Sequence, residues 1–302
     1  MEAVFSFIAQ VLRISAPYAL AASGGALSER CGVINIALEG IMLGGAFGAA
    51  AGTIASGDPW LGALCGLAAG AFLALLHAAV TVGAKADQIL SGLAINLLAL
   101  GATRGMLRVL YGSSSNSPRL SAIPEFDAPW LRPLGALAEV IGDPLFLLAA
   151  ALIAGAQVLL FGTGFGLSLR AAGDGPEALD GAGLSVSQTR YAGVILSGVL
   201  GGAAGVWLVM QQRMFSDGMS GGRGYIALAA MIVGRWSPLG GALACLLFGV
   251  AETAQMRIPG DVLPTQFVQM LPYVVTLIVL VGWVGRSHPP TALGEPYDRE
   301  RR

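Results

Sequence analysis

Charged residues are scarce in this chain. They make up 12% of its 302 residues, whereas an average soluble domain contains about 25%. Hydrophobic residues make up 55%, the mean hydropathy is +0.72, and apolar runs long enough to cross a bilayer recur along the chain. Within lipid, helices satisfy their own backbone polar groups. The composition excludes a soluble protein and predicts an all-α, polytopic helical membrane protein with about 8–10 transmembrane helices, some short or interrupted.

Lysine is nearly absent, since Lys85 is the only one. A phosphate-binding loop of the Gly-x-x-x-x-Gly-Lys-Ser/Thr type is therefore impossible, and the chain is not itself a P-loop ATPase. Cys31, Cys65 and Cys245 lie far apart, without the spacing of a disulfide framework or a metal site, and we interpret them as packing residues. The sequence contains no catalytic constellation, and the net charge of −1 does not favour nucleic acid. We expect no enzyme activity, metal or cofactor in this chain.

Glycine, in contrast, is abundant at 44 residues, and small residues let helices approach closely in lipid. We predict one transmembrane domain over 1–285, an ordered extracytoplasmic loop at 112–143 and a polar cytoplasmic tail at 286–302. The predicted spans are 4–26, 33–56, 60–82, 89–111, 144–162, 191–211, a short 225–235, 238–256 and 265–284. The segment 225–235 is too short to cross completely, because about 20 residues are needed.

Orientation follows the distribution of lysine and arginine. If the tail is cytoplasmic, one group lies inside: Arg30, Lys85, Arg170, Arg190, Arg235, Arg286, Arg299, Arg301 and Arg302. The other group lies outside or near it: Arg13, Arg104, Arg108, Arg119, Arg132, Arg213, Arg223 and Arg257. The two groups are nearly equal in size, so they give a preference for an inside tail and no more.

The segment 169–190 is the longest polar interruption that still has the pattern of folded structure. Asp174 and Glu177 have the spacing of a capping box, and Pro176 fits the first helical turn. Gly181 and Gly183 provide an end for the helix after about two turns. The segment is therefore either a docking element containing a short helix or an ordinary structured loop, and we favour the first.

Polar residues inside apolar spans are costly and need a reason. Asn35 and Glu39 lie one helical turn apart, either lining a pathway or forming a structural lock in which Glu39 pairs with Arg30 or with a neighbouring helix terminus. Asn96 fits an interhelical hydrogen bond and a substrate contact equally well, and Glu252 is a second intramembrane carboxylate candidate. Arg104 and Arg108 are expected to extend to the interface, and His77 to be satisfied in the core.

A short sequence similarity, here called the sequence echo, relates two segments in the two halves of the chain. Ile36-Ala37-Leu38 followed by Gly44 resembles Ile226-Ala227-Leu228 followed by Gly234, at a constant offset. Transporters are often built from repeats with the substrate site at their interface. In a chain so rich in Ala, Leu and Gly, chance similarity is the simpler explanation.

Five stretches together have the pattern of one protein family. They are SERCGVINIALEGIMLGGAF (28–47), LSGLAINLLALGATR (90–104), RAAGDGPEALDGAGL (170–184), GGRGYIALAAMIVGRWSPLGG (221–241) and LPYVVTLIVLVGWVGRSHPPTALGEPY (271–297). They resemble the permease subunits of bacterial ABC importers for branched-chain amino acids, ribose and nucleosides, and most closely the nucleoside, guanosine-type branch. The resemblance implies a permease that forms half of a pathway in the bacterial plasma membrane. It also implies a second, different permease, a cytoplasmic ABC ATPase that binds ATP–Mg, and an extracytoplasmic substrate-binding lipoprotein.

The resemblance also assigns roles to residues. The segment 170–184 becomes the coupling helix region that docks on the ATPase, with Arg170, Asp174, Gly175, Pro176, Glu177, Ala178 and Gly183 as the coupling residues. Asn35, Glu39, Asn96 and Glu252 are the candidates for the translocation pathway. Two alternatives stay open: a permease for branched-chain amino acids or simple sugars, and, in a different class, a channel or secondary transporter that needs no ATPase.

Overall fold

The computed structural model describes residues 2–124, 126, 133, 135–257, 270, 274 and 288–298. These residues form helices and no β-strand. The helices are α1 (Glu2–Arg30), α2 (Leu38–Ser56), α3 (Pro59–Ala78), a π-helical turn η1 (Ala79–Gly83), α4 (Gln88–Tyr111), α5 (Ala136–Ile141), α6 (Pro144–Gly162), α7 (Gly164–Asp174), α8 (Pro176–Gly181), α9 (Val186–Gln212), α10 (Arg223–Val233) and α11 (Pro238–Arg257).

Seven of the described helices are long and apolar enough to cross a membrane, with η1 continuing α3. This confirms the prediction of an all-α polytopic membrane protein. Helix α10 has only 11 residues, as expected for the short segment. The main difference lies at the predicted span 33–56, whose first residues are not helical, since α2 begins at Leu38. The predicted span 265–284 lies outside the described residues.

Local sequence explains where many of these helices begin and end. The side chains of Asp58, Asp87 and Asp143 accept hydrogen bonds from backbone N–H groups in the first turns of α3, α4 and α6. At the ends of α2 and α4, Gly57 and Gly112 adopt the left-handed conformation that favours glycine. The polar residues between the apolar runs therefore set the helix boundaries.

The packing relates the first and last parts of the bundle. In one part of the bundle, α9 packs on α3, and α2 packs on both of them. In the other part, α1 packs on α11, and α10 packs on both of them. Exchanging α1, α2 and α3 with α9, α10 and α11 thus preserves the contacts. The sequence echo pairs the same two helices, α2 and α10, with a shift in register, because Ile36–Leu38 ends at the first residue of α2 whereas Ile226–Leu228 lies inside α10.

Glycine lets α2, α3 and α9 pack at close range. A Cβ atom on Gly45 of α2 would lie 2.6 Å from the Cα atom of Gly202 of α9. A Cβ atom on Gly202 would in turn lie 2.7 Å from the carbonyl oxygen of Gly66 of α3. Because backbone atoms cannot move aside as a flexible side chain does, these positions require glycine.

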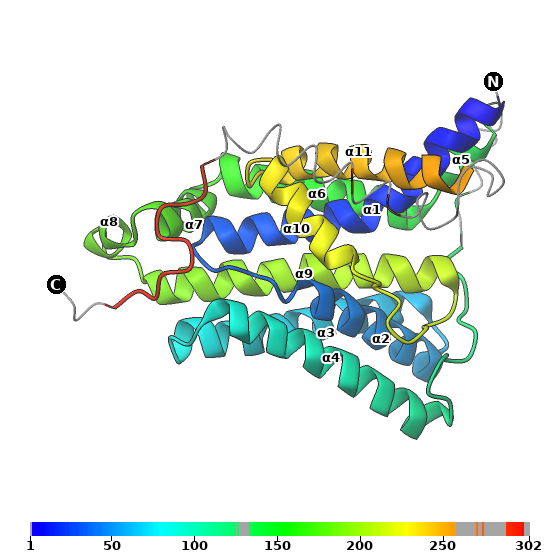
Figure 1. The fold of residues 1–302 in the computed structure, drawn as a ribbon, viewed down its shortest axis with the longest axis horizontal. Coiled ribbons are helices and arrows are strands. Elements are labelled where there is room, and N and C mark those ends of the chain that lie inside the picture. The colour runs from blue at the N-terminus through cyan, green and yellow to red at the C-terminus, as the bar shows by residue number, and fades with distance from the viewer. Residues whose placement is uncertain are drawn as a thin grey trace.

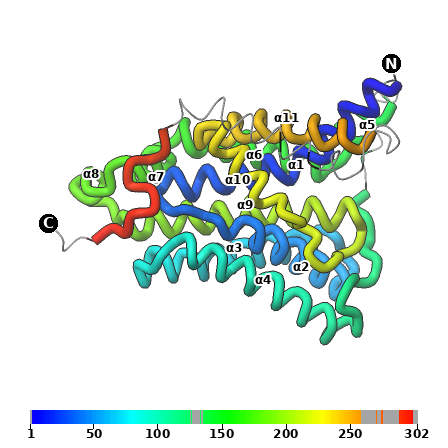
Figure 2. The backbone as a smooth tube through the Cα atoms, in the orientation of Figure 1, coloured from blue at the N-terminus to red at the C-terminus, as the bar shows by residue number. Residues whose placement is uncertain are grey.

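The bundle has two distinct ends, the α8 end and the α5 end (Figures 1 and 2). The α8 end gathers the α1–α2 turn, the η1–α4 loop, the α10–α11 turn and the tail segment 288–298. The α5 end gathers the N-terminus of α1, the α2–α3 turn and the connections that follow α4 and α9. The described members of the two predicted groups of lysine and arginine accordingly separate toward opposite ends.

Candidate functional site

The stretch between α1 and α2 is a break in the helical structure that starts at the α8 end and runs into the bundle (Figure 1). Residues 31–37 leave the helical path, and side chains from α3 and α4 bind the backbone groups that the break frees. The N–H of Ile34 donates to Gln88 Oε1 at 2.7 Å, and its carbonyl oxygen lies 2.9 Å from His77 Nε2. His77 is fully buried and also lies 2.9 Å from Ser91 Oγ, which confirms the prediction of a satisfied core histidine.

Asn96 of α4 joins this break to α10. Its Oδ1 accepts from the N–H of Gly40 at 2.7 Å, in the first turn of α2. Its Nδ2 donates to the carbonyl oxygen of Ile36 at 3.0 Å and to Tyr225 Oη at 3.1 Å. The interhelical hydrogen bond, one of the two roles considered for Asn96, is therefore present. Sequence reasoning did not single out Tyr225, although a tyrosine after a glycine-rich turn was a visible signal.

Asn35 lies inside the break and is fully buried. Its Nδ2 donates to Ser197 Oγ of α9 at 2.9 Å, and its Oδ1 has no hydrogen-bond partner among the described residues. The side chain thus faces the packed interior between the break and α9.

Glu39, in the first turn of α2, caps a different helix. Its two carboxylate oxygens accept from the N–H groups of Gly222 at 2.8 Å and Gly224 at 2.7 Å, at the start of α10. A carboxylate is favoured there because the free N–H groups carry partial positive charge. Of the two pairings considered for a structural lock, Glu39 therefore makes the one with a neighbouring helix terminus. The pairing with Arg30 is wrong, because Arg30 donates to the carbonyl oxygens of Arg235 and Trp236.

The remaining intramembrane candidates also have partners within the chain. Glu252 of α11 accepts a hydrogen bond of 2.5 Å from Tyr18 Oη of α1. Arg104 of α4 forms an ion pair with Asp217, in the connection between α9 and α10. The expectation that Arg104 only extends to the interface was incomplete, because Asp217 is distant in sequence and its approach depends on the fold.

Helix α8 forms within the predicted docking segment, and its start corrects one detail. Pro176 is its first residue, as predicted. The capping box is wrong: the residue preceding α8 is Gly175, no side chain caps the helix, and Asp174 is the last residue of α7. A residue held in the helix α7 cannot also adopt the extended conformation that an N-cap needs. Helix α7 has such a cap, since the Thr163 side chain, between α6 and α7, accepts from the N–H of Gly166 at 3.0 Å.

Gly183 provides the turn that ends α8. Gly183 has φ +82°, and the N–H of Leu184 donates to the carbonyl oxygen of Leu179 at 3.2 Å, as in a Schellman motif. Leu179 is buried, whereas Glu177 and Ala178 are exposed. Helix α8 is thus fixed by one apolar side chain and presents the opposite face outward.

The tail segment 288–298 is tied to α7 and to the α1–α2 break. The N–H of Ala292 donates to the carbonyl oxygen of Gly173 at 2.8 Å, and the N–H of Gly294 donates to that of Gly32 at 3.1 Å. Gly173 itself packs against the turn after α1, since a Cβ atom there would lie 3.0 Å from the nitrogen of Gly32. The tail, α7 and the break therefore share one junction.

Arg190 of α9 lies at the centre of this junction. It is 3% exposed and donates to the carbonyl oxygens of Glu295 at 2.6 Å and Ala172 at 3.2 Å. These carbonyl oxygens bind both terminal nitrogens of the guanidinium, as a buried charge requires, whereas its Nε has no hydrogen-bond partner among the described residues. Beside it, burial raises the pKa of the Cys31 thiol to about 12, so this thiol stays protonated at neutral pH.

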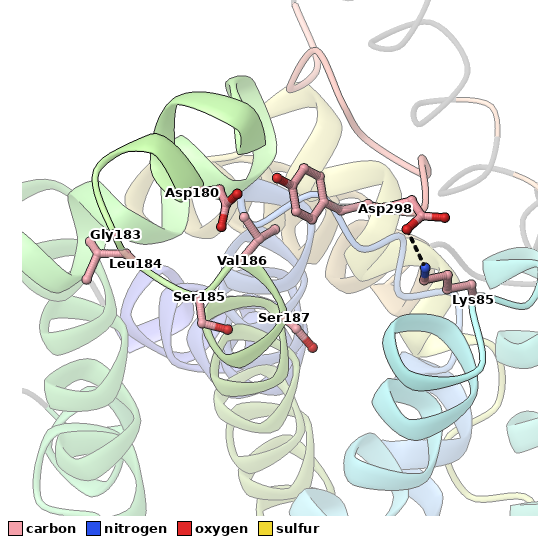
Figure 3. Close-up of a pocket in the computed structure, with 9 residues that line it drawn as sticks. Lys85, Asp180, Gly183, Leu184, Ser185, Val186, Ser187 and Asp298 are labelled. Carbon is pink, nitrogen blue, oxygen red and sulfur yellow. Dashed lines mark ion pairs between the residues drawn. The ribbon is translucent and has the colours of Figure 1, made fainter. Parts of the chain in front are cut away.

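A cavity of about 500 Å³ opens beside α8 (Figure 3). The segment from Gly183 to Ser187 forms one wall, and Lys85 and Asp298, joined by an ion pair of 3.1 Å, lie opposite. The α8 end thus presents a short helix, a hollow and a tail side by side.

These features can be compared with known proteins. Residues 7–280 match the family described as "Branched-chain amino acid transport system / permease component". The chain belongs to this family. The permease is 38% identical to the guanosine ABC transporter permease protein NupQ of Bacillus subtilis over 95% of each chain. It is 39% identical to the nucleoside ABC transporter permease protein NupC of Lactococcus lactis over 97% of each chain.

More distant relatives extend the comparison. The permease is 31% identical to the putative glucose ABC transporter permease protein TsgC13 of Haloferax volcanii, over 93% of this chain and 94% of the relative. The two bacteria named above each contain a second, more distant permease that also matches, at 23% and 22% identity. The permease is therefore a multi-pass membrane protein of ABC transporter type.

Proposed function

We propose that the permease is one membrane subunit of an ATP-driven nucleoside importer in the bacterial plasma membrane. Its similarity to NupQ and NupC over nearly the whole chain carries this proposal. A second permease completes the pathway, as the paired relatives in both bacteria suggest. A separate cytoplasmic ATPase binds ATP–Mg, and an extracytoplasmic lipoprotein delivers the nucleoside. The permease itself catalyses no reaction and binds no cofactor.

In this proposal the α8 end faces the cytoplasm and Glu177 and Ala178 contact the ATPase. Arg170, Asp174, Gly175, Pro176 and Gly183 fix the position of α8 relative to α7. Movement of α8 passes along α7 to Gly173, and from there to Gly32 and the break before α2. The contacts of the junction support this route, because Gly173 packs against the turn at Gly32 and backbone hydrogen bonds tie both residues to the tail.

The pathway candidates divide into two kinds. Glu39 and Asn96 hold the ends of α2 and α10, where interrupted helices meet, and transporters often bind substrate at such places. Asn35 and Glu252 do not contact the substrate in this proposal, since their side chains bind partners inside the bundle. We therefore propose that Asn96 lies nearest to the nucleoside and that the other three position helices along its route.

The test is transport by the complete importer in vesicles. Labelled guanosine should accumulate only when ATP and the ATPase are present. Unlabelled guanosine should compete, whereas leucine, ribose and glucose should not. Competition by leucine or by a sugar would show that the substrate is an amino acid or a sugar and not a nucleoside. Accumulation without the ATPase would overturn the proposal in favour of a secondary transporter.

A further inference from the structure

Tyr225 lies in the first turn of α10 with much of its side chain uncovered. The residue is 45% exposed, while its neighbours Gly224 and Ala227 face inward and are buried. Gly224 packs directly on α2, since a Cβ atom there would lie 2.5 Å from the Cα atom of Glu39. Helix α10 is thus fixed on its inner side and presents the ring of Tyr225 on its outer side.

Asn96 fixes the position of the Tyr225 hydroxyl. The amide donates to Tyr225 Oη, and its remaining hydrogen-bonding groups bind Ile36 and Gly40 of the break. The hydroxyl accepts in this bond, and its own hydrogen has no acceptor among the hydrogen bonds of the described residues. Tyr225 therefore offers a fixed donor beside an exposed aromatic face.

This polar surface lies well inside the membrane-spanning part of the protein. Asn96 follows the start of α4 by eight residues, about 12 Å along a helix of 24 residues. A donor without a partner is costly against lipid, so water or a ligand must reach it. The starts of α2 and α10 meet at the same place through Glu39.

We propose that Tyr225 contacts the base of the nucleoside during transport, stacking its ring on the base and donating its hydroxyl hydrogen to a base nitrogen or carbonyl. The inference rests on the proposed function. Stacking on an aromatic side chain suits any base because every base has a planar π-face. An aliphatic amino acid lacks such a face, so this contact would favour a nucleoside.

Cysteine accessibility tests the contact in the complete importer. Tyr225→Cys is made in a Cys65→Ser background, because Cys65 is exposed whereas Cys31 and Cys245 are buried. A charged, membrane-impermeant thiol reagent should modify Tyr225→Cys during ATP turnover, and guanosine should slow the reaction at least threefold. Phe72→Cys is the matched control, since Phe72 is an exposed aromatic residue on α3, a helix that packs on α2 and α9. It should stay unmodified.

Two results of the labelling would overturn the proposal: no modification at Tyr225→Cys, or modification that guanosine does not slow. Transport adds a second readout. Tyr225→Leu should lower guanosine uptake about tenfold, by the loss of one stacking contact, while ATP hydrolysis continues. Tyr225→Phe, which keeps the ring, should lower guanosine uptake less than Tyr225→Leu does. If Tyr225→Leu instead prevents co-purification of the second permease, Tyr225 contacts that subunit and the proposal is wrong. Uptake by the unmodified importer separately tests the proposed function.

Discussion

Glu39 shows how a single intramembrane carboxylate is accommodated. Its two oxygens bind the N–H groups of Gly222 and Gly224, so the charge lies at the positive end of α10. Asn96 serves α2 in the same way, because the residue preceding α2 provides no side-chain cap. Side chains from other parts of the chain thus replace the local caps that the interrupted helices lack.

Replacing Glu39 with Gln should destabilise the permease. The amide keeps one acceptor oxygen and loses the charge, so one backbone N–H is left unpaired, at a cost of about 2 kcal/mol. The thermal melting temperature in detergent should fall measurably. Glu177→Gln is the control, because Glu177 is exposed and its replacement should change stability little. Equal melting temperatures for both variants would contradict the capping role.

At the scale of elements, the central contact is the close packing of α2, α3 and α9. Gly202 of α9 approaches the backbone of α3 so closely that any side chain would collide with it. Hydropathy predicts these helices one at a time but does not reveal which glycines face a neighbour.

Gly202→Ala should therefore destabilise the bundle by about 1–3 kcal/mol, because the added methyl group meets backbone atoms. Gly101→Ala is a matched control on α4, where an added Cβ atom meets nothing within 4 Å. Since alanine favours helix, this control should be neutral or slightly stabilising. Thermal unfolding of the two variants distinguishes the positions, and equal destabilisation would contradict the packing argument.

Helix α8 is the element on which coupling depends in the proposed function. Glu177→Lys reverses the charge of its exposed face, so ATP-dependent uptake should fall at least tenfold while membrane insertion stays intact. Glu2→Lys is the control, since Glu2 is an exposed carboxylate in the first turn of α1, at the α5 end. Full uptake by Glu177→Lys would contradict the assignment of α8 to the ATPase contact.

At the scale of the whole molecule, the tail joins parts that are far apart in sequence. Residues 292–295 bind α7, the turn after α1 and Arg190 of α9. The sequence indicated only a polar tail, because its hydrogen bonds are made largely by backbone atoms that leave no side-chain pattern.

Gly294→Val should detach the tail. Gly294 has φ +83°, which a β-branched residue rarely adopts, and its Cβ atom would lie 3.0 Å from Ile34 Cδ1. If the tail transmits movement of α8, the number of nucleosides transported per ATP hydrolysed should fall severalfold. Thr291→Val, at an exposed tail position, should leave this ratio unchanged. An unchanged ratio in Gly294→Val would show that the tail is not part of the coupling route.

The sequence by itself determined the membrane class, the approximate helices and the position of α8, because hydropathy, proline and glycine act through local structure. It also identified Asn35, Glu39, Asn96 and Glu252 as polar residues in need of partners. Only the tertiary structure decided what those partners are. Glu39 binds residues more than 180 positions away, and Asn96 joins α4 to α2 and α10. A hydrogen bond depends on distance in space, and only the folded chain fixes that distance.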